Sequence, residues 1–405
     1  MHQPWEVLKV FQGGVTADCA FDWDPPDPPR SSQSWNEAVY GAEPLANLTS
    51  EETEGACFKR PEKKAPATFR SFKDFSKRLN SRERSNRRAR PILFVGGCHR
   101  SGTSVLARLL KQSPLVAGME DTDAPEDEGQ HLQSILPTDE DFGGVGRFAL
   151  DDRYCWTEAT TDPDPASSAE ELLYTWGNWW LRSSERRSRR TRADRGKILM
   201  RPLLLEKTPS NIVHTRWLRK AFGPAARFLV IVRHPLACAL ATREFLRDFE
   251  SPTPTLRDVL RNWVAAHARL EADAVELRRM ALLDDVKFGS GDACLLRIYL
   301  SDLVRDPAAV LDRVSQELVD APLHIDADAI AAVVKKGDPD EKYREMWRKW
   351  PDAAFVWDEP DTFDHDEKRA PSTRREAGAK GIMAEFAEPF ARNGFPRAFK
   401  DEWAR

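Results

Sequence analysis

The sequence has no apolar run long enough to cross a membrane. Nowhere in its 405 residues do about 18 apolar residues follow one another, which is the least that a spanning helix needs. The opening stretch, MHQPWEVLKVFQGGV, has neither a basic flank nor a sustained apolar segment, so a secretory signal peptide of the usual kind is not predicted. These features predict a cytoplasmic or otherwise soluble protein.

Closely spaced cysteines and a strong net charge are also missing. The six cysteines form no CxxC pair and no spacing typical of metal ligands: Cys19, Cys57, Cys98, Cys155, Cys238 and Cys294. This pattern suits free thiols in a reducing compartment, and one or two disulfides are compatible with it. The net charge is -4, so no general attraction for nucleic acid is expected. We predict no metal site and no nucleic-acid partner.

Residues 1–90 carry few signs of a folded core. The stretch FDWDPPDPPRSSQSW is rich in proline and serine, and RLNSRERSNRRARP is a strongly basic run just before the first apolar strand. Such composition is typical of poorly ordered chain. We interpret the basic run as a solvated linker; a surface for an anionic partner is the alternative.

Four apolar runs that end in polar residues mark strands, and a helical pattern follows each of them. The runs are ILFVGG from residue 92, KILMRPLLLEK from residue 197, ARFLVIV from residue 226 and ACLLRIYLSDLV from residue 293. Strands that alternate with helices predict right-handed crossovers and a mostly parallel sheet covered on both faces. The predicted fold class is therefore α/β, with three layers.

The glycine loop after the first strand has the spacing of a triphosphate-binding loop but lacks the lysine. Four residues separate Gly97 from Gly102, and Thr103 stands where that lysine belongs. Arg100 lies inside the loop, so a cation is present at another position. Three hydroxyl side chains can donate hydrogen bonds to a phosphate: Ser101, Thr103 and Ser104. The backbone N–H groups at the start of the following helix can do the same. We predict a P-loop NTPase-like sandwich whose loop binds a phosphate ligand other than a triphosphate.

Cationic side chains stand at the ends of two further strands. Lys207 follows Glu206, and Arg233 precedes His234. Ligands of an open parallel sheet bind outside the carboxyl ends of the strands. We therefore expect Arg100, Lys207 and Arg233 to share a pocket for an anion, and we expect His234 to be a hydrogen-bonded residue at the strand end rather than a catalyst. An acidic Mg²⁺ ligand that directly ends an apolar strand is missing, which argues against an NTPase.

Three motifs together resemble those of the PAPS-dependent sulfotransferases. GGCHRSGTS is similar to their 5′-phosphosulfate loop, in which a lysine or arginine precedes Ser-Gly-Thr. LLLEKTPSN resembles the Glu-Lys-Thr/Ser-Pro segment of the Golgi-type and bacterial members, and FLVIVRHPLACALA resembles the strand and helix that bind the 3′-phosphate. The resemblance covers residues 91–323 in the family's order. Two more stretches, EDEGQHLQSILP and GGVGRFAL, are similar to one subgroup.

The resemblance implies that PAPS is the co-substrate and gives each motif a role. Five loop residues would hold the 5′-phosphosulfate: Arg100, Ser101, Gly102, Thr103 and Ser104. Arg233 would pair with the 3′-phosphate, and Lys207 would lie near the bridging oxygen and the acceptor. A serine that the family uses for the 3′-phosphate is Ala241 here, so Thr242 is the candidate replacement. In the late Arg-Tyr-Glu-Asp-Leu segment the glutamate is Ser301, and we assign it no role.

The acceptor of a sulfuryl group needs a general base, usually Glu or His. The stretch GMEDTDAPEDEGQHLQ, after the first helix, supplies three candidates. Glu120 stands two residues after Gly118, similar in placement to the catalytic glutamate of protein-tyrosine sulfotransferases. Glu128 and His131 belong to the Asp-Glu-Gly-Gln-His segment of the subgroup. We favour Glu128 and keep Glu120 and His131 as alternatives.

An arginine-rich insertion is expected at residues 182–196. The stretch RSSERRSRRTRADRG has Ala193 as its one apolar residue, which predicts an exposed loop. It is either solvated or a surface for a polyanionic acceptor such as a sulfated glycan. Just before it, three tryptophans have near-helical spacing and are expected in the core or the wall of a cleft, with stacking on a sugar as the alternative: Trp176, Trp179 and Trp180.

We predict a core over residues 91–335 and a charged C-terminal extension, 336–405, that wraps this core. Three tryptophans would anchor the extension: Trp347, Trp350 and Trp357. The predicted enzyme moves a sulfuryl group from PAPS to a hydroxyl acceptor, with a carbohydrate as the expected class. The alternatives are a P-loop kinase of a small molecule and an inactive module that only binds the nucleotide. A location in the Golgi lumen would require a longer N-terminus than the printed one.

Overall fold

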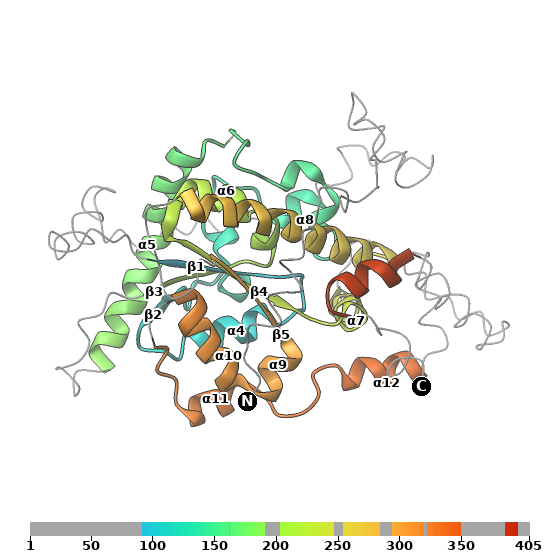
Figure 1. Ribbon diagram of the computed structural model, residues 1–405. Helices are drawn as coiled ribbons and strands as arrows, with labels where there is room; N and C mark the ends of the chain where they lie inside the picture. The colour runs from blue at the N-terminus through green and yellow to red at the C-terminus, as the bar shows by residue number, and fades with distance from the viewer. Residues whose placement is uncertain are drawn as a thin grey trace. The chain divides into compact units, whose positions relative to one another are not determined.

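The computed structural model describes residues 91–161, 163–190, 203–246, 254–283, 294–319, 322–349 and 385–395. All of them belong to one compact unit, Lys64–Arg405. Residues 1–90, with the basic run, lie outside the described residues. A parallel sheet occupies the middle layer, and helices cover both of its faces (Figure 1).

The sheet has five strands in the order β2-β3-β1-β4-β5, and every neighbouring pair is parallel. The strands are β1 (Ile92–Gly96), β2 (Val116–Gly118), β3 (Leu203–Lys207), β4 (Ala226–Val232) and β5 (Leu295–Tyr299). Because all carboxyl ends point the same way, the segments that follow β1, β3 and β4 lie along one edge. The predicted α/β class with a mostly parallel sheet is confirmed.

Alternation along the strands feeds two separate apolar layers. Leu93 and Val95 of β1 pack on one face of the sheet, whereas Ile92 and Phe94 pack on the other. The first face is covered by α4 (Thr103–Leu110), α9 (Leu300–Arg305), α10 (Pro307–Arg313) and α11 (Ala327–Val333). The second is covered by α5 (Pro165–Arg190), α6 (Thr215–Phe222), α7 (Pro235–Leu246) and α8 (Leu256–Leu283). Strands buried on both faces explain why their sequences are almost entirely apolar.

Three local expectations need correction. The last strand ends at Tyr299, and Leu300–Arg305 is the helix α9 rather than a continuation of the strand. The expected loop over 182–196 is wrong for residues 182–190, because α5 continues to Arg190; residues 191–196 lie outside the described part. Finally, β2 has three residues and gave no recognisable pattern. Arginine is a good helix former, so a run without apolar residues can extend a helix that is already nucleated.

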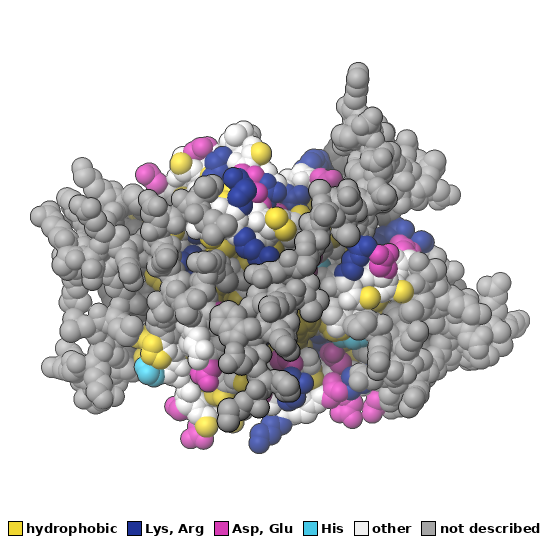
Figure 2. Space-filling view, viewed as in Figure 1, with side chains coloured by type: hydrophobic (Ala, Val, Ile, Leu, Met, Phe, Trp, Pro, Cys, Tyr) yellow, Lys and Arg dark blue, Asp and Glu magenta, His cyan; other side chains and the backbone are white. Residues whose placement is uncertain are grey.

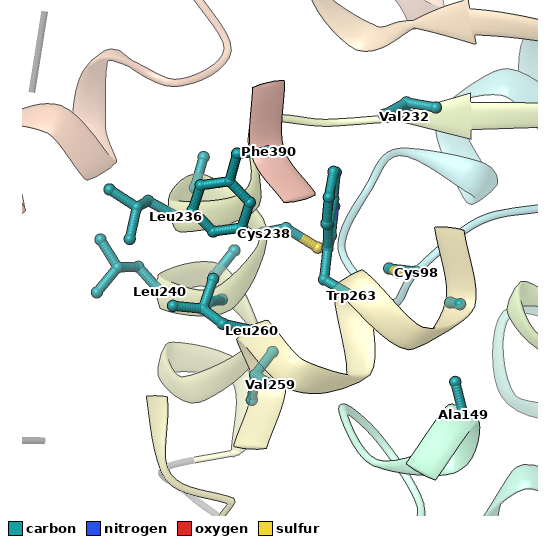
Figure 3. Packing of buried hydrophobic residues seen from close by; sticks show 14 of the residues in the cluster. Cys98, Ala149, Val232, Leu236, Cys238, Leu240, Val259, Leu260, Trp263 and Phe390 are labelled. Atoms are coloured by element: carbon teal, nitrogen blue, oxygen red, sulfur yellow. The ribbon is translucent and has the colours of Figure 1, made fainter. Parts of the chain in front are cut away.

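The described parts of the C-terminal extension pack on α7 and α8. Trp347 lies in α12 (Glu341–Lys349), is 2% exposed, and belongs to the same apolar cluster as Leu236 and Trp263. Figure 3 shows Phe390, from the helical residues 385–392, over α7 and beside Trp263. Trp350 and Trp357 lie outside the described residues, and the boundary at residue 335 stays a prediction.

The described residues show the distribution of charge on one face and the state of four of the six cysteines. Basic and acidic side chains are interspersed over the face shown in Figure 2. The four cysteines within the described residues are free: Cys98, Cys155, Cys238 and Cys294. None of the helices in the described ranges is long and apolar enough to span a bilayer.

Candidate active site

The loop between β1 and α4 forms the centre of the site. Ser101 N donates to Cys98 O at 3.1 Å and Gly97 N donates to Pro209 O at 3.0 Å, which fixes the loop against the end of β3. At Gly97 a Cβ would come within 2.6 Å of Ile231 O, so only glycine fits this close approach. The N–H groups of the first turn of α4 have no partner within the helix and face the same edge, where they can bind an anion.

Ser101 indicates that the loop is shaped for a ligand. Its side chain is 1% exposed, and its Oγ has no hydrogen-bond partner among the described residues. A buried hydroxyl without a partner is costly, and such groups are rare in folded proteins. A phosphoryl or sulfuryl oxygen in the loop is the kind of group that would satisfy it.

Arg100 supplies the cation of the loop. Its φ of 63° is a left-handed conformation, which is uncommon for a residue with a side chain and is often found at functional sites. The side chain is exposed, and its guanidinium lies 5.0 Å above the ring of Phe245. The role of Arg100 as the cation that meets the ligand stays a prediction.

Lys207, at the end of β3, joins the loop to the favoured base. Its Nζ donates to Glu128 Oε1 at 2.9 Å and to Ser104 Oγ at 3.3 Å. Lys207 is 5% exposed and Glu128 is 7% exposed, so the ion pair is almost fully shielded from solvent. The structure thus brings one predicted loop residue, the predicted lysine and the favoured carboxylate into direct contact.

Neighbouring side chains hold the Glu128 carboxylate in place. Gln130 Nε2 donates to Glu128 Oε2 at 2.8 Å, and Gln130 Oε1 accepts from Asp139 N at 3.1 Å. This second bond sets the orientation of the amide, since the oxygen must face an N–H. His131 Nε2 lies 3.7 Å from Glu128 Oε2, so this alternative base stands beside the favoured one. Asp139 in turn lies 2.7 Å from His99 Nε2 in the loop.

Glu206, the neighbour of Lys207, has a structural position rather than one facing the site. It is 1% exposed and accepts hydrogen bonds from Thr208 Oγ1, Asn211 Nδ2 and Gly129 N. A Cβ at Gly129 would lie 2.4 Å from Glu206 Oε1, so glycine is required for this contact. The carboxylate thereby ties the segment that carries Glu128 to the end of β3.

Burial raises the pKa of Glu206 from 4.5 to about 7, against the opposing effect of the hydrogen bonds from Thr208 and Asn211. Because the folded pKa is the higher one, the stabilisation from the protonated form is complete below about pH 4.5 and is lost as the pH rises through about 7. We expect the free energy of unfolding to fall across this window, by on the order of 3 kcal/mol from this group.

Glu206→Gln cannot ionise, so its unfolding free energy is expected to depend less on pH over the same window. Urea unfolding of both proteins between about pH 5 and pH 8 measures the difference. Glu140→Gln, at an exposed position, is the matched control and should keep the slope of the unmutated protein. Parallel curves for Glu206→Gln and the unmutated protein would contradict the expectation.

Arg233, after β4, contacts both the loop and the C-terminal extension. Its Nη1 donates to Arg100 O at 2.8 Å, its Nε donates to Asp340 Oδ1 at 2.8 Å, and its Nη2 donates to Pro339 O at 2.7 Å. The guanidinium also lies 4.9 Å above the ring of Tyr343. The expected placement of Arg233 beside the loop holds, but its partners from residues 339–343 were not predicted, because no local pattern links residues more than a hundred positions apart.

The remaining predicted residues make no hydrogen bond to Lys207 or Glu128 among those described in the structure. Thr242 is fully buried, and its Oγ1 donates to Cys238 O at 2.8 Å within α7, so it does not face the loop. Glu120 follows Met119, just after β2. His234 is 9% exposed and its ring packs edge-on against Phe395; the hydrogen bond expected for it stays a prediction.

The three tryptophans of α5 are part of the core. Trp176 and Trp180 are each 2% exposed, and their indole N–H groups donate to Gly129 O and Leu205 O. Trp179 is 9% exposed and has the guanidinium of Arg182 5.1 Å above its ring. The alternative that they stack on a sugar is therefore not supported. Instead, Trp176 is bonded to the segment that carries Glu128, and Trp180 is bonded to the strand that carries Lys207.

A pocket with about 430 Å³ of empty space, open solvent included, adjoins Ser104 and Lys207. Its floor contains Met119 and Leu205, and its rim carries charges of both signs: Arg108, Lys111, Glu126 and Asp127. Four acidic residues beside it have left-handed backbone conformations: Asp121, Asp123, Glu126 and Asp127. Strain of this kind is often concentrated at ligand sites. The described residues contain no group of three or more His, Cys, Asp or Glu that could hold a metal ion.

The glycine loop, Lys207 and Glu128 thus lie together at the carboxyl edge of a parallel α/β sheet. Residues 91–319, more than half of the chain, match the family model described as "Sulfotransferase family". The protein therefore belongs to the sulfotransferase family, and sulfuryl transfer is its general activity. The match spans all five strands and the residues of the loop.

Solved structures of sulfotransferases show partial similarity. A sulfotransferase of Alicyclobacillus acidocaldarius is 17% identical, with 78% of this chain and 100% of that chain covered and a TM-score of 0.35. One of Mycobacterium avium is 18% identical, with 77% and 80% covered and a TM-score of 0.36. The sulfotransferase domain of the Synechococcus PCC 7002 olefin synthase is 17% identical, with 72% and 94% covered and a TM-score of 0.32. No curated protein sequence matches the chain.

Proposed function

We propose that the protein transfers a sulfuryl group from PAPS to a hydroxyl acceptor, and that Lys207 and Glu128 carry out the chemistry. The observation that carries this proposal is the contact of Lys207 Nζ with both Ser104 Oγ of the loop and Glu128 Oε1, at 3.3 and 2.9 Å. One cation thereby bridges the place where the leaving phosphate would sit and the place where the acceptor would lose its proton.

The donor would lie along the carboxyl edge of the sheet. The 5′-phosphosulfate would bind the first-turn N–H groups of α4 and the side chains of Arg100, Ser101, Thr103 and Ser104, with Gly102 allowing the turn at φ 106°. The 3′-phosphate would bind Arg233. Because the hydroxyl of Thr242 is used within α7, we leave Thr242 out of the proposed site. A metal is not needed in this scheme, since arginine, lysine and backbone groups supply the positive charge.

In the proposed step, the acceptor oxygen attacks sulfur in line with the bond to the leaving phosphate. A new S–O bond forms to the acceptor, the S–O bond to the phosphate breaks, and its electron pair stays on the phosphate oxygen. Lys207 would turn from Glu128 toward that oxygen and stabilise its growing charge. Glu128, released from the ion pair, would take the proton of the acceptor. The products are the sulfated acceptor and adenosine 3′,5′-bisphosphate.

The pocket beside Lys207 is the proposed acceptor site. Its mixed rim suits an uncharged molecule with several hydroxyl groups, because Glu126 and Asp127 can accept hydrogen bonds from hydroxyls and Arg108 can donate to them. The apolar floor of Met119 and Leu205 suits the C–H face of a sugar ring. A carbohydrate hydroxyl is therefore the acceptor class that we propose. We propose it for a soluble enzyme without a nucleic-acid partner.

Calorimetric titration tests the donor without knowledge of the acceptor. We expect adenosine 3′,5′-bisphosphate to bind at least about tenfold more tightly than AMP or ATP, because it alone has a 3′-phosphate that can meet the shielded Arg233. A preference for ATP would support the kinase alternative instead. An absence of binding by all three nucleotides would overturn the proposed function. Tight binding of the bisphosphate without turnover on any acceptor would point to the inactive binding module.

A further inference from the structure

A turn of the C-terminal extension lies over Arg233. The turn consists of residues 337–340 and connects α11 to α12. Asp340 Oδ1 accepts from Arg233 Nε at 2.8 Å, and Pro339 O accepts from Arg233 Nη2 at 2.7 Å. Together with the bond from Nη1 to Arg100 O, each of the three guanidinium nitrogens has a protein acceptor.

This ion pair is well shielded. The side chain of Arg233 is 10% exposed and that of Asp340 is 12% exposed. Tyr343 covers the guanidinium, with 4.9 Å from its ring centroid to Cζ. In such surroundings a carboxylate and an arginine interact more strongly than they do on an open surface.

A carboxylate and a phosphate cannot both use the same N–H groups of Arg233. We propose that Asp340 is an internal competitor for the 3′-phosphate, so that the donor must displace Asp340 from Arg233 and the turn must move when the donor binds. This proposal rests on the proposed PAPS chemistry, which assigns the 3′-phosphate to Arg233. It adds a residue outside the three motifs, and that residue weakens the binding of any nucleotide with a 3′-phosphate.

The turn is bonded to α12 as well as to Arg233, since Asp340 O accepts from Tyr343 N at 3.0 Å and from Arg344 N at 2.9 Å, and Asp338 pairs with Arg344. Gly337 has a φ of 119°, and a Cβ added to it would meet nothing within 4 Å, so the backbone there has room to change. By contrast, α12 is held to α7 through Lys342 and Tyr343, which both donate to Glu244. Trp347 in the same helix is buried. We therefore expect the change that frees Arg233 to be confined to the Asp340 side chain and the Pro339 carbonyl, while Asp340 O keeps its bonds to α12.

Competition of this kind has a use in the reaction cycle. The spent nucleotide keeps its 3′-phosphate after the sulfuryl group has left, so Arg233 alone would hold product as firmly as donor. The return of Asp340 to Arg233 would favour release of adenosine 3′,5′-bisphosphate. Product release limits the turnover of many enzymes, so a competitor at this position would raise the rate.

Asp340→Asn tests the proposal by calorimetry with two probes. Loss of the negative charge should tighten binding of adenosine 3′,5′-bisphosphate by about tenfold, because the phosphate no longer displaces a charged partner. Binding of AMP, which lacks the 3′-phosphate, should change less than about twofold. Glu341→Gln is the matched control, since it removes a negative charge from the next residue. The side chain of Glu341 accepts no hydrogen bond among the described residues. The affinities of this variant for the bisphosphate and for AMP should stay unchanged.

The outcomes separate the two proposals. If neither the unmutated protein nor Asp340→Asn binds the bisphosphate, the proposed donor is wrong and the inference fails with it. If the unmutated protein and Asp340→Asn bind the bisphosphate equally, the proposed donor is retained and the proposed role of Asp340 as a competitor is wrong. If Asp340→Asn increases the affinity for AMP as much as that for the bisphosphate, Asp340 does not compete with the 3′-phosphate, and the proposal is overturned.

A second measurement uses the unmutated protein and does not depend on the folding of a variant. Hydrogen–deuterium exchange of the peptide that covers residues 337–344 should become faster when adenosine 3′,5′-bisphosphate is added, since the turn leaves Arg233. AMP should leave this exchange unchanged. Unchanged or slower exchange with the bisphosphate would mean that the nucleotide binds without opening the turn, contrary to the proposal.

Discussion

Lys207→Met is expected to lower the rate of sulfuryl transfer by on the order of 10²–10³-fold, the loss that follows removal of one preorganised donor from a transition state. The side chain lies within 3.3 Å of Ser104 Oγ, in a site that excludes most solvent. Charge develops on the leaving oxygen during the reaction, so an ammonium at this position stabilises the transition state more than the bound donor. Methionine keeps the volume and removes the charge.

The affinity for adenosine 3′,5′-bisphosphate should change only a few-fold in Lys207→Met, because the loop and Arg233 supply the remaining contacts. Turnover can be followed as formation of the bisphosphate from PAPS in the presence of a panel of mono- and disaccharides. Lys220→Met, at an exposed position in α6, is the matched control and should keep full activity. Unchanged turnover in Lys207→Met would show that the site is misassigned.

Loss of Lys207 also leaves the Glu128 carboxylate without its cation, and that effect has to be separated from catalysis. Breaking a buried ion pair by removal of one partner commonly costs about 3–5 kcal/mol of stability. The double variant Lys207→Met with Glu128→Gln removes both charges and should recover part of that stability. It should recover none of the activity. Thermal unfolding of both variants therefore distinguishes a folding defect from a chemical one.

The central fold was predictable because it depends on local signals. Each of the runs that contain β1, β3 and β4 is apolar on both faces and ends at polar residues, which is how buried parallel strands appear in a sequence. The short β2 was missed, because three residues carry no measurable periodicity. The helical part of 182–190 was also missed, since its polar composition is equally typical of a loop.

In the site too, residues marked by a local pattern were predictable, whereas contacts between distant residues were not. Arg100, Lys207 and Arg233 were identified because each lies at the end of a strand or shortly after it, and parallel topology brings such positions together. The contact between Lys207 and Glu128 joins positions 79 residues apart, and that between Arg233 and Asp340 joins positions 107 apart. Neither pairing leaves a mark in the local sequence. Glu128 was found as a candidate from its motif, whereas Asp340 needed the structure.

Glu128→Gln is expected to reduce transfer by on the order of 10²–10⁴-fold, the usual contribution of a positioned general base. The amide keeps the shape of the carboxylate, so an oxygen can still accept from Lys207 while the group can no longer take a proton from the acceptor. Binding of adenosine 3′,5′-bisphosphate should be nearly unchanged, since the carboxylate of Glu128 is bonded to Lys207 and Gln130 and not to the loop or to Arg233.

Glu120→Gln and His131→Asn provide the comparison, because they alter the two alternative bases. Both should keep transfer within a few-fold of the unmutated enzyme, although His131→Asn also changes a group 3.7 Å from Glu128. A large loss in Glu120→Gln with normal turnover in Glu128→Gln would reverse the assignment. The base would then be Glu120, which follows Met119. The ion pair of Glu128 with Lys207 would serve only to hold the lysine beside the loop.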